Sequence, residues 1–226
     1  MSTVIGDILP LAVGVAVSPV PIIAVILMLL APRATAAGVG FAIGWVVGIV
    51  AVTTITVALA SGADIAGDGD SGPSTGAAWV QLVLGLLLLA VAVKQWQGRP
   101  RPGEEAHLPK WMAAIDTINT GKALGLGFLL SAINPKNLLL CISAGVAVAD
   151  SDLDGSEQAV TITVFTVLAA STVLVPVIAY LVARERMRHP LAELKVWLQA
   201  NNATVMAVLL LVIGVTLVDK GIGGLG

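Results

Sequence analysis

The sequence is poor in charged residues. Only 12% of its 226 residues are charged, whereas 57% are hydrophobic, and the mean hydropathy is +0.97. A soluble domain carries about 25% charged residues, so this composition predicts an integral membrane protein. The formal net charge is −2, which gives no support for a nucleic-acid-binding surface.

Cysteine and histidine are scarce as well. Cys141 is the single cysteine, so no disulfide can form within the chain. A membrane thiol–disulfide carrier needs two exchanging cysteines, and that enzyme class is therefore excluded. His107 and His189 both lie outside the apolar runs. No zinc site or histidine relay inside the membrane is expected, and no Ser-His-Asp arrangement around Ser18 or Ser131.

The chain also lacks a nucleotide-binding P-loop. Gly121-Lys122 has no glycine at the required upstream position and is followed by alanine. ATP hydrolysis by a P-loop is thereby excluded, and transport would have to be driven by a gradient or by a partner. We expect a protein that is not an enzyme and that uses no cofactor and no metal.

Six apolar runs are long enough to cross about 30 Å of hydrocarbon as helices. The first residues carry no lysine or arginine, so the first run is expected to be a retained span rather than a signal peptide. The expected spans are 6–30, 36–61, 78–96, 123–149, 158–183 and 203–218.

Basic residues concentrate in alternate connections between these runs. The connections 62–77 and 150–157 contain acidic residues and no lysine or arginine. The positive-inside bias therefore predicts a multi-pass plasma-membrane protein with both termini outside. Ten of the twelve basic residues lie on the predicted cytoplasmic side: Arg33, Lys94, Arg99, Arg101, Lys110, Lys122, Arg184, Arg186, Arg188 and Lys195.

Two of the runs carry a proline near their centre. Ser18-Pro19-Val20-Pro21 lies in the middle of 6–30, and Asn134-Pro135-Lys136 lies in the middle of 123–149. Each is the first run of a group of three, and an odd number of spans per group makes the groups cross in opposite senses. Matching broken helices in inverted halves indicate a site at mid-membrane depth in secondary transporters.

The predicted fold is therefore an all-α membrane protein. It has six transmembrane helices arranged as two inverted three-helix repeats, with the first and fourth helices broken by proline. The expected division is 1–97 for the first repeat, 98–122 for a cytoplasmic loop with an interfacial helix, and 123–226 for the second repeat.

Lys136 is the most unusual residue of this pattern. A lysine at mid-depth is costly unless it is paired or faces water. It would either bind a negative head group or carry a proton that couples transport to a gradient. The alternative is a simple proline kink whose lysine reaches towards an interface. The candidate substrate-binding residues are Ser18, Pro19, Pro21, Ser131, Asn134, Pro135, Lys136 and Asn137.

Three further patterns concern packing and the loops. The segments 190–200 and 109–118 have apolar residues at helical spacing and are expected to be interfacial helices. Gly40, Gly44 and Gly48 form a GxxxGxxxG stripe, which favours close helix packing within the chain and leaves dimerisation open. The acidic segment 150–155 copies half of an EF-hand loop but lacks the closing glutamate, so a solvated loop is favoured over a weak calcium site.

Two motifs carry a family resemblance. They are PKWM at 109–112 followed by KALGLGFLLSAINPKNLLL at 122–140, and SPVPIIAV at 18–25. This pattern resembles the GAP family of glycolipid- or sulfolipid-addressing membrane proteins, which belongs to the lysine-exporter superfamily. The resemblance implies a six-helix export-type fold and a role in moving glycolipids towards the cell surface.

Two functions of different classes remain open. The first is a secondary exporter that translocates a glycolipid or another polar or anionic substrate across the plasma membrane. The second is a non-transporting membrane scaffold that assists a lipid synthase or a larger lipid exporter. Expected partners are membrane lipids, the substrate, and either such an enzyme or a second copy of the chain in a homodimer.

Overall fold

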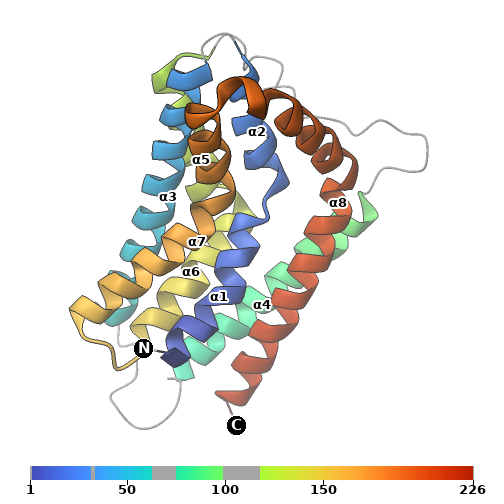
Figure 1. Cartoon of the computed structure of the whole chain (residues 1–226). Coiled ribbons are helices and arrows are strands. Elements are labelled where there is room, and N and C mark those ends of the chain that lie inside the picture. Colours follow the sequence, from blue (N-terminus) through green and yellow to red (C-terminus); the bar gives the residue numbers. More distant parts are fainter. Residues whose placement is uncertain (1, 32–33, 63–74, 99–117, 226) are drawn as a thin grey trace.

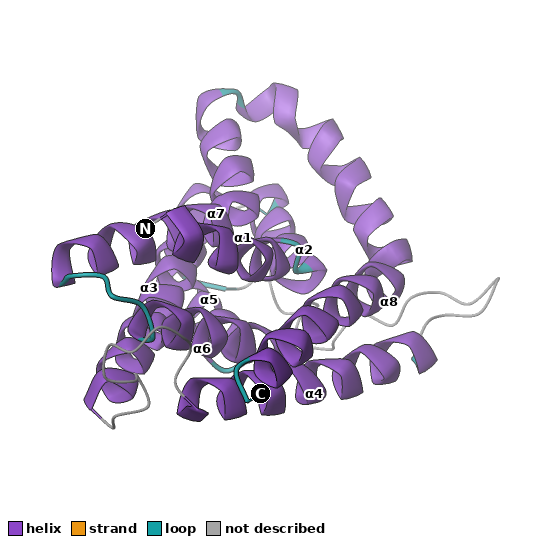
Figure 2. Cartoon of the chain, turned by 90° about the horizontal axis from the view of Figure 1, so that it is seen from below, coloured by secondary structure: helices purple, strands orange, loops and turns teal. Residues whose placement is uncertain are grey.

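The computed structural model describes residues 2–31, 34–62, 75–98 and 118–225, and its regular structure there is entirely helical (Figures 1 and 2). The prediction of an all-α protein is confirmed for this part of the chain. The eight helices described are α1 (Ser2–Ala16), α2 (Pro19–Leu30), α3 (Ala34–Gly62), α4 (Thr75–Gln97), α5 (Thr120–Ala132), α6 (Pro135–Ala149), α7 (Gly155–Val182) and α8 (Arg184–Gly223).

Four of these helices, α3, α4, α7 and α8, are each long and apolar enough to cross a membrane. The remaining helices form two bent pairs, and each pair passes the same test when taken as one span. The bend is 51° between α1 and α2 and 63° between α5 and α6. The described chain therefore has four to six candidate spans, which makes it a multi-pass membrane protein.

The glycine stripe of α3 packs against α5. A Cβ on Gly44 would lie 2.8 Å from the carbonyl carbon of Leu124 and 3.0 Å from the backbone nitrogen of Phe128. Gly40 and Gly48 meet α5 in the same way, at Thr120 and at Ser131 and Phe128. The two helices approach this closely because no side chain separates their backbones. The prediction that the stripe packs within the chain is confirmed.

Helices α4 and α8 form a second close pair, seen side by side in Figures 1 and 2. Gly85 of α4 lies against the backbones of Gly214 and Val218, and Gly221 of α8 lies against Leu82. Small residues again allow the two backbones to approach. Both tight contacts therefore join a helix from residues 1–97 to one from residues 118–225.

The segment 190–200 is helical but does not form a separate element. It is continuous with the last apolar run in α8, which changes direction after crossing the top of the molecule (Figure 1). Leu191 and Leu198 are buried, and Leu194 is 39% exposed. Within this helix, Asn201 donates its side-chain amide to the Trp197 carbonyl one turn earlier (2.9 Å). The other expected interfacial helix, 109–118, lies almost wholly outside the described residues.

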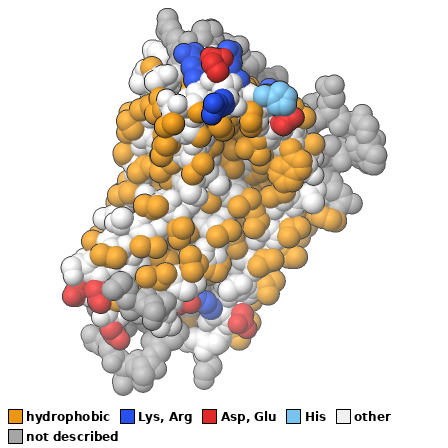
Figure 3. Space-filling view, viewed as in Figure 1, with side chains coloured by type: hydrophobic (Ala, Val, Ile, Leu, Met, Phe, Trp, Pro, Cys, Tyr) orange, Lys and Arg blue, Asp and Glu red, His pale blue; other side chains and the backbone are white. Residues whose placement is uncertain are grey.

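Charge divides between the two ends of the molecule. Lys and Arg side chains gather at the top of Figure 3 around the start of α8, and acidic side chains dominate the opposite end. Both chain ends lie at that opposite end (Figure 1). There Lys220 of α8 forms an ion pair with Asp7 of α1, which ties the first helix to the last.

The acidic segment before α7 acts as a helix cap. Asp154 accepts hydrogen bonds from the backbone N–H groups of Ser156 and Glu157, and Glu157 completes a capping box. The hydrogen bond from the Ser156 hydroxyl, together with these backbone bonds, lowers the pKa of Asp154. One carboxylate of the EF-hand-like segment is thus used to start α7.

Candidate functional site

The first helix break opens the hydrogen-bond ladder between α1 and α2. The Ser18 N–H bonds to the Ala16 carbonyl (2.8 Å) and not to Gly14, its partner in a continuous helix. Pro19 and Pro21 have no N–H to offer the preceding turn. The Gly14 carbonyl is therefore left without its helical donor, inside a buried region.

The second break, between α5 and α6, follows the same logic. The Asn134 N–H bonds to the Leu129 carbonyl (3.2 Å), so the Leu130 carbonyl loses its helical donor. Asn134 then caps α6, because its side-chain oxygen accepts the Lys136 N–H (3.2 Å). Among the carbonyls that each break frees is the one four residues before the residue that precedes the proline.

Side chains from the start of α6 satisfy the freed carbonyls of Gly14 and Leu130. The Lys136 ammonium donates to the Gly14 carbonyl (2.5 Å), and the Asn137 amide donates to the Leu130 carbonyl (2.9 Å). The Ser18 hydroxyl donates to the Asn137 side-chain oxygen (3.2 Å), which closes the link between the breaks. Three of the predicted site residues, Ser18, Lys136 and Asn137, therefore make contacts that join the two breaks, and they are called here the break cluster.

The break cluster is enclosed. Lys136 is 6% exposed, Ser18 is 3% exposed and Asn137 is 0% exposed. Within the described residues, no carboxylate lies at ion-pair distance from the Lys136 ammonium. Its contact is the dipole of one carbonyl, which compensates a buried charge only in part. Lys136 therefore has no charged partner among the described residues.

The other predicted site residues have local structural roles and do not share the contacts of Lys136. Pro19 and Pro21 are buried in the first turn of α2 and create the break without a polar contact of their own. Ser131 is buried, but its hydroxyl donates to the Gly127 and Phe128 carbonyls of its own helix, 3.0 Å each. Asn134 is a local cap, and Pro135 is exposed.

One functional contact was missed by the sequence analysis. Thr172 of α7 donates its hydroxyl to the Ala16 carbonyl (2.6 Å), next to the first break. A second helix thus stabilises the irregular backbone of α1. The signal was the polar pair Ser171-Thr172 inside an apolar run, four residues before Pro176.

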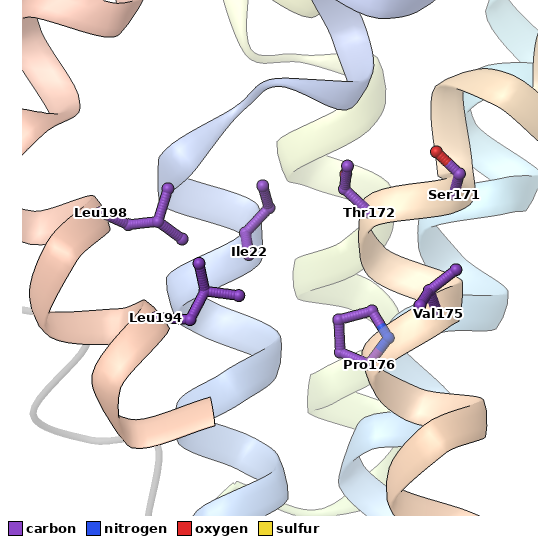
Figure 4. Close-up of a pocket in the computed structure, with 7 residues that line it drawn as sticks. All are labelled: Ile22, Ser171, Thr172, Val175, Pro176, Leu194 and Leu198. Carbon is purple, nitrogen blue, oxygen red and sulfur yellow. The ribbon is translucent and has the colours of Figure 1, made fainter. Parts of the chain in front are cut away.

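An apolar groove lies beside the first break, between α2, α7 and the first half of α8 (Figure 4). Its volume is about 350 Å³. In Figure 4, Ile22 and Leu194 extend into the space that faces α7. The residues that line it are Ile22, Ser171, Thr172, Val175, Pro176, Leu194 and Leu198.

A family model described as "Sap, sulfolipid-1-addressing protein" matches residues 8–223. This match covers both breaks and nearly all of the described helices. The chain belongs to this family. The Sap-like part of the resemblance is thereby confirmed, and membership of the lysine-exporter superfamily stays a prediction. No curated protein and no solved structure matches the chain.

Metal ligands do not cluster among the described residues. No group of three or more His, Cys, Asp or Glu side chains among them is placed to hold a metal ion. Cys141, one turn along α6 from Asn137, is buried and free. The polar groups at the two breaks are amide, hydroxyl, carbonyl and amine.

Proposed function

We propose that this Sap-family protein is a secondary exporter that moves an anionic glycolipid, or another polar anionic lipid, across the plasma membrane. The observation that carries the proposal is the buried Lys136, which contacts a freed backbone carbonyl and no carboxylate among the described residues. A charge in such a place is characteristic of substrate or ion pathways. The family description and the apolar helices support a role in lipid handling at the membrane.

The packing pattern supports two inverted repeats. If α1–α4 correspond to α5–α8, the contact of α5 with α3 corresponds to that of α1 with α7, and both contacts occur. The same correspondence exchanges α4 with α8 and α3 with α7, so it maps each of these two contacts onto itself. Both contacts occur. In such folds the site lies between the halves at their broken helices. In the proposal, the break cluster is this site between the two halves.

Lys136 serves in this proposal as the anchor for the negative head group. The lipid anion displaces the Gly14 carbonyl and pairs with the ammonium, which compensates the charge better than a neutral dipole does. The proton-carrying role of Lys136 is the second candidate, since lysine can lose its proton and arginine cannot.

The proposal is tested by comparing lipids at the cell surface and in whole cells, with and without the protein. We expect a lipid class to be lost from the surface of cells lacking the protein while it accumulates inside, because synthesis continues and export stops. Mass spectrometry of surface and total extracts measures both pools. A reintroduced wild-type copy is the control.

The two functional classes give different results in that experiment. Failure to make the lipid at all would indicate a scaffold for a synthase, and an unchanged lipid surface would contradict the proposed export. Purified protein in liposomes then provides the direct measurement, because an exporter moves the identified lipid between leaflets without any other protein.

The proposed orientation places the basic end in the cytoplasm and both termini outside. Thr75→Cys, at the exposed start of α4, should react with an impermeant thiol reagent in intact cells. His189→Cys, whose native side chain is 82% exposed, should react only after permeabilisation. Both variants are made with Cys141→Ala, which removes the native thiol. The reverse labelling pattern would invert the assignment.

A further inference from the structure

The apolar groove between α2, α7 and α8 is separate from the break cluster and takes no part in binding by Lys136. Its volume of about 350 Å³ falls within the range of small-molecule pockets. Val175 on its wall is 62% exposed and Leu194 is 39% exposed. Neighbouring positions of α7 carry further exposed apolar side chains, Ile178 and Leu181. The groove therefore opens onto an apolar surface of a membrane protein, where hydrocarbon rather than water is the neighbour.

The helix segment that supplies Leu194 and Leu198 to the groove carries an excess of basic residues. The segment 184–198, which supplies Leu194 and Leu198, carries four basic residues and two acidic ones. Arg184 is fixed there, because its Nε donates to the Tyr180 hydroxyl (2.7 Å) and its guanidinium lies 5.5 Å from the ring centre. Tyr180 lies four residues, about 6 Å, beyond Pro176 of the groove wall. An anionic head group beside this segment would meet complementary charge.

The other side of the groove reaches the first break. Thr172 lines the groove and donates its hydroxyl to the Ala16 carbonyl, two residues from the carbonyl that Lys136 contacts. Pro176 has no N–H, so it cannot donate to the Thr172 carbonyl as a helical residue would. The groove thus has an apolar lining and lies beside the first break, which it reaches through Thr172.

We propose that this groove binds one acyl chain of an anionic lipid that enters from the inner leaflet, with the lipid head group on the basic residues at the start of α8. The inference rests on the proposed export function and gives it a lateral entrance. The apolar lining selects the chain, and the charge of segment 184–198 selects the head group.

Photo-crosslinking tests this assignment on the full chain. The protein is placed in phosphatidylcholine vesicles with a trace of phosphatidylglycerol whose acyl chain carries a diazirine. After illumination, mass spectrometry should find the lipid on peptides containing Ile22, Val175 and Leu194. The same diazirine chain on phosphatidylcholine should give about tenfold less product at these peptides, because it lacks the negative head group.

Substitutions in one helix provide a matched pair. Val175→Trp should fill the groove and remove the cross-link there, whereas Ile178→Trp, at a similarly exposed position of α7 outside the lining, should keep it. Leu194→Trp should fill the groove from α8 and likewise remove the cross-link. It replaces the α7 variant in the test if Val175→Trp does not fold. Arg186→Gln combined with Arg188→Gln should reduce the preference for phosphatidylglycerol.

Two outcomes would overturn the groove assignment. One is a cross-link spread evenly over the lipid-facing helices, and the other is an equal yield from both head groups. Failure of the export function is separable, because cross-linking measures binding without transport. A groove that binds lipid in a protein whose loss leaves surface lipids unchanged would contradict export alone. If Lys136→Ala reduces export as predicted but the wild-type protein shows no cross-link at the groove peptides, the groove assignment alone would be contradicted.

Discussion

Replacing Lys136 with alanine is expected to reduce lipid export by about tenfold to a hundredfold. The ammonium is the only charged group of the break cluster, and a hydrogen bond to a charged group contributes about 1.5 to 3 kcal/mol. Loss of that contribution to the bound lipid lowers the transport rate by the corresponding factor. The measurement is the rate at which the lipid appears on the outer surface, normalised to the amount of protein in the membrane.

Lys136→Arg separates the two roles that remain for this lysine. Arginine keeps the positive charge but does not release its proton. If Lys136 binds the head group, as proposed, Lys136→Arg should retain a substantial part of the export rate. If Lys136 carries the coupling proton, the arginine variant should be as inactive as the alanine variant.

The matched control is Lys122→Ala, which removes an exposed lysine from the start of α5. It should export at the wild-type rate. The alanine variant at position 136 should also reach the membrane in normal amounts, because it removes a buried charge that lacks a carboxylate partner. Export by Lys136→Ala at the wild-type rate would show that this lysine is only structural.

The positions of both breaks could be predicted from sequence because their cause is local. Proline removes a donor at a known place, so Pro19 and Pro135 located the end of one half-helix and the start of the next. The apolar length of the runs likewise predicted the spans. The small-residue stripe at Gly40, Gly44 and Gly48 indicated a close helix partner but could not name α5.

The contacts within the site depend on tertiary packing and could not be predicted. Sequence places Ser131 and Lys136 near the same break, yet the hydroxyl of Ser131 turns back to its own helix and only Lys136 crosses to α1. The acceptor for Lys136 is a backbone carbonyl of Gly14, and no side-chain pattern marks such a group. Thr172 was overlooked for the same reason, since its acceptor is the Ala16 carbonyl.

The continuity of α8 shows a different limit. The sequence analysis predicted an interfacial helix over 190–200 from the helical spacing of its apolar residues, and a separate last span over 203–218 from its apolar run. Burial of Leu191 and Leu198 against the core stabilises the helix across this region. Tertiary packing thus joins the two predicted helices into one.

The largest expected effect on folding is that of Gly44→Ala. One added methyl group on α3 would lie 2.8 Å from the Leu124 carbonyl carbon and 3.0 Å from the Phe128 nitrogen. Both are backbone atoms of α5, so no side chain can rotate away and the helices must separate. Overpacking of a well-packed interface costs about 1 to 3 kcal/mol even where side chains can adjust. We expect a clear loss of thermal stability in detergent, measured as the temperature at which the monodisperse peak disappears in size-exclusion chromatography.

Gly125→Ala is the matched control for this prediction. Gly125 lies in the partner helix α5, and a Cβ there would meet no atom within 4 Å. This substitution should be neutral or slightly stabilising, because alanine favours a helix over glycine by about 1 kcal/mol. The two variants therefore compare the same glycine-to-alanine change inside the α3–α5 contact, at Gly44, and outside it, at Gly125. Equal stability of the two variants would mean that α3 and α5 do not pack through the glycine stripe, and the close approach that positions α5 before the second break would then be wrong.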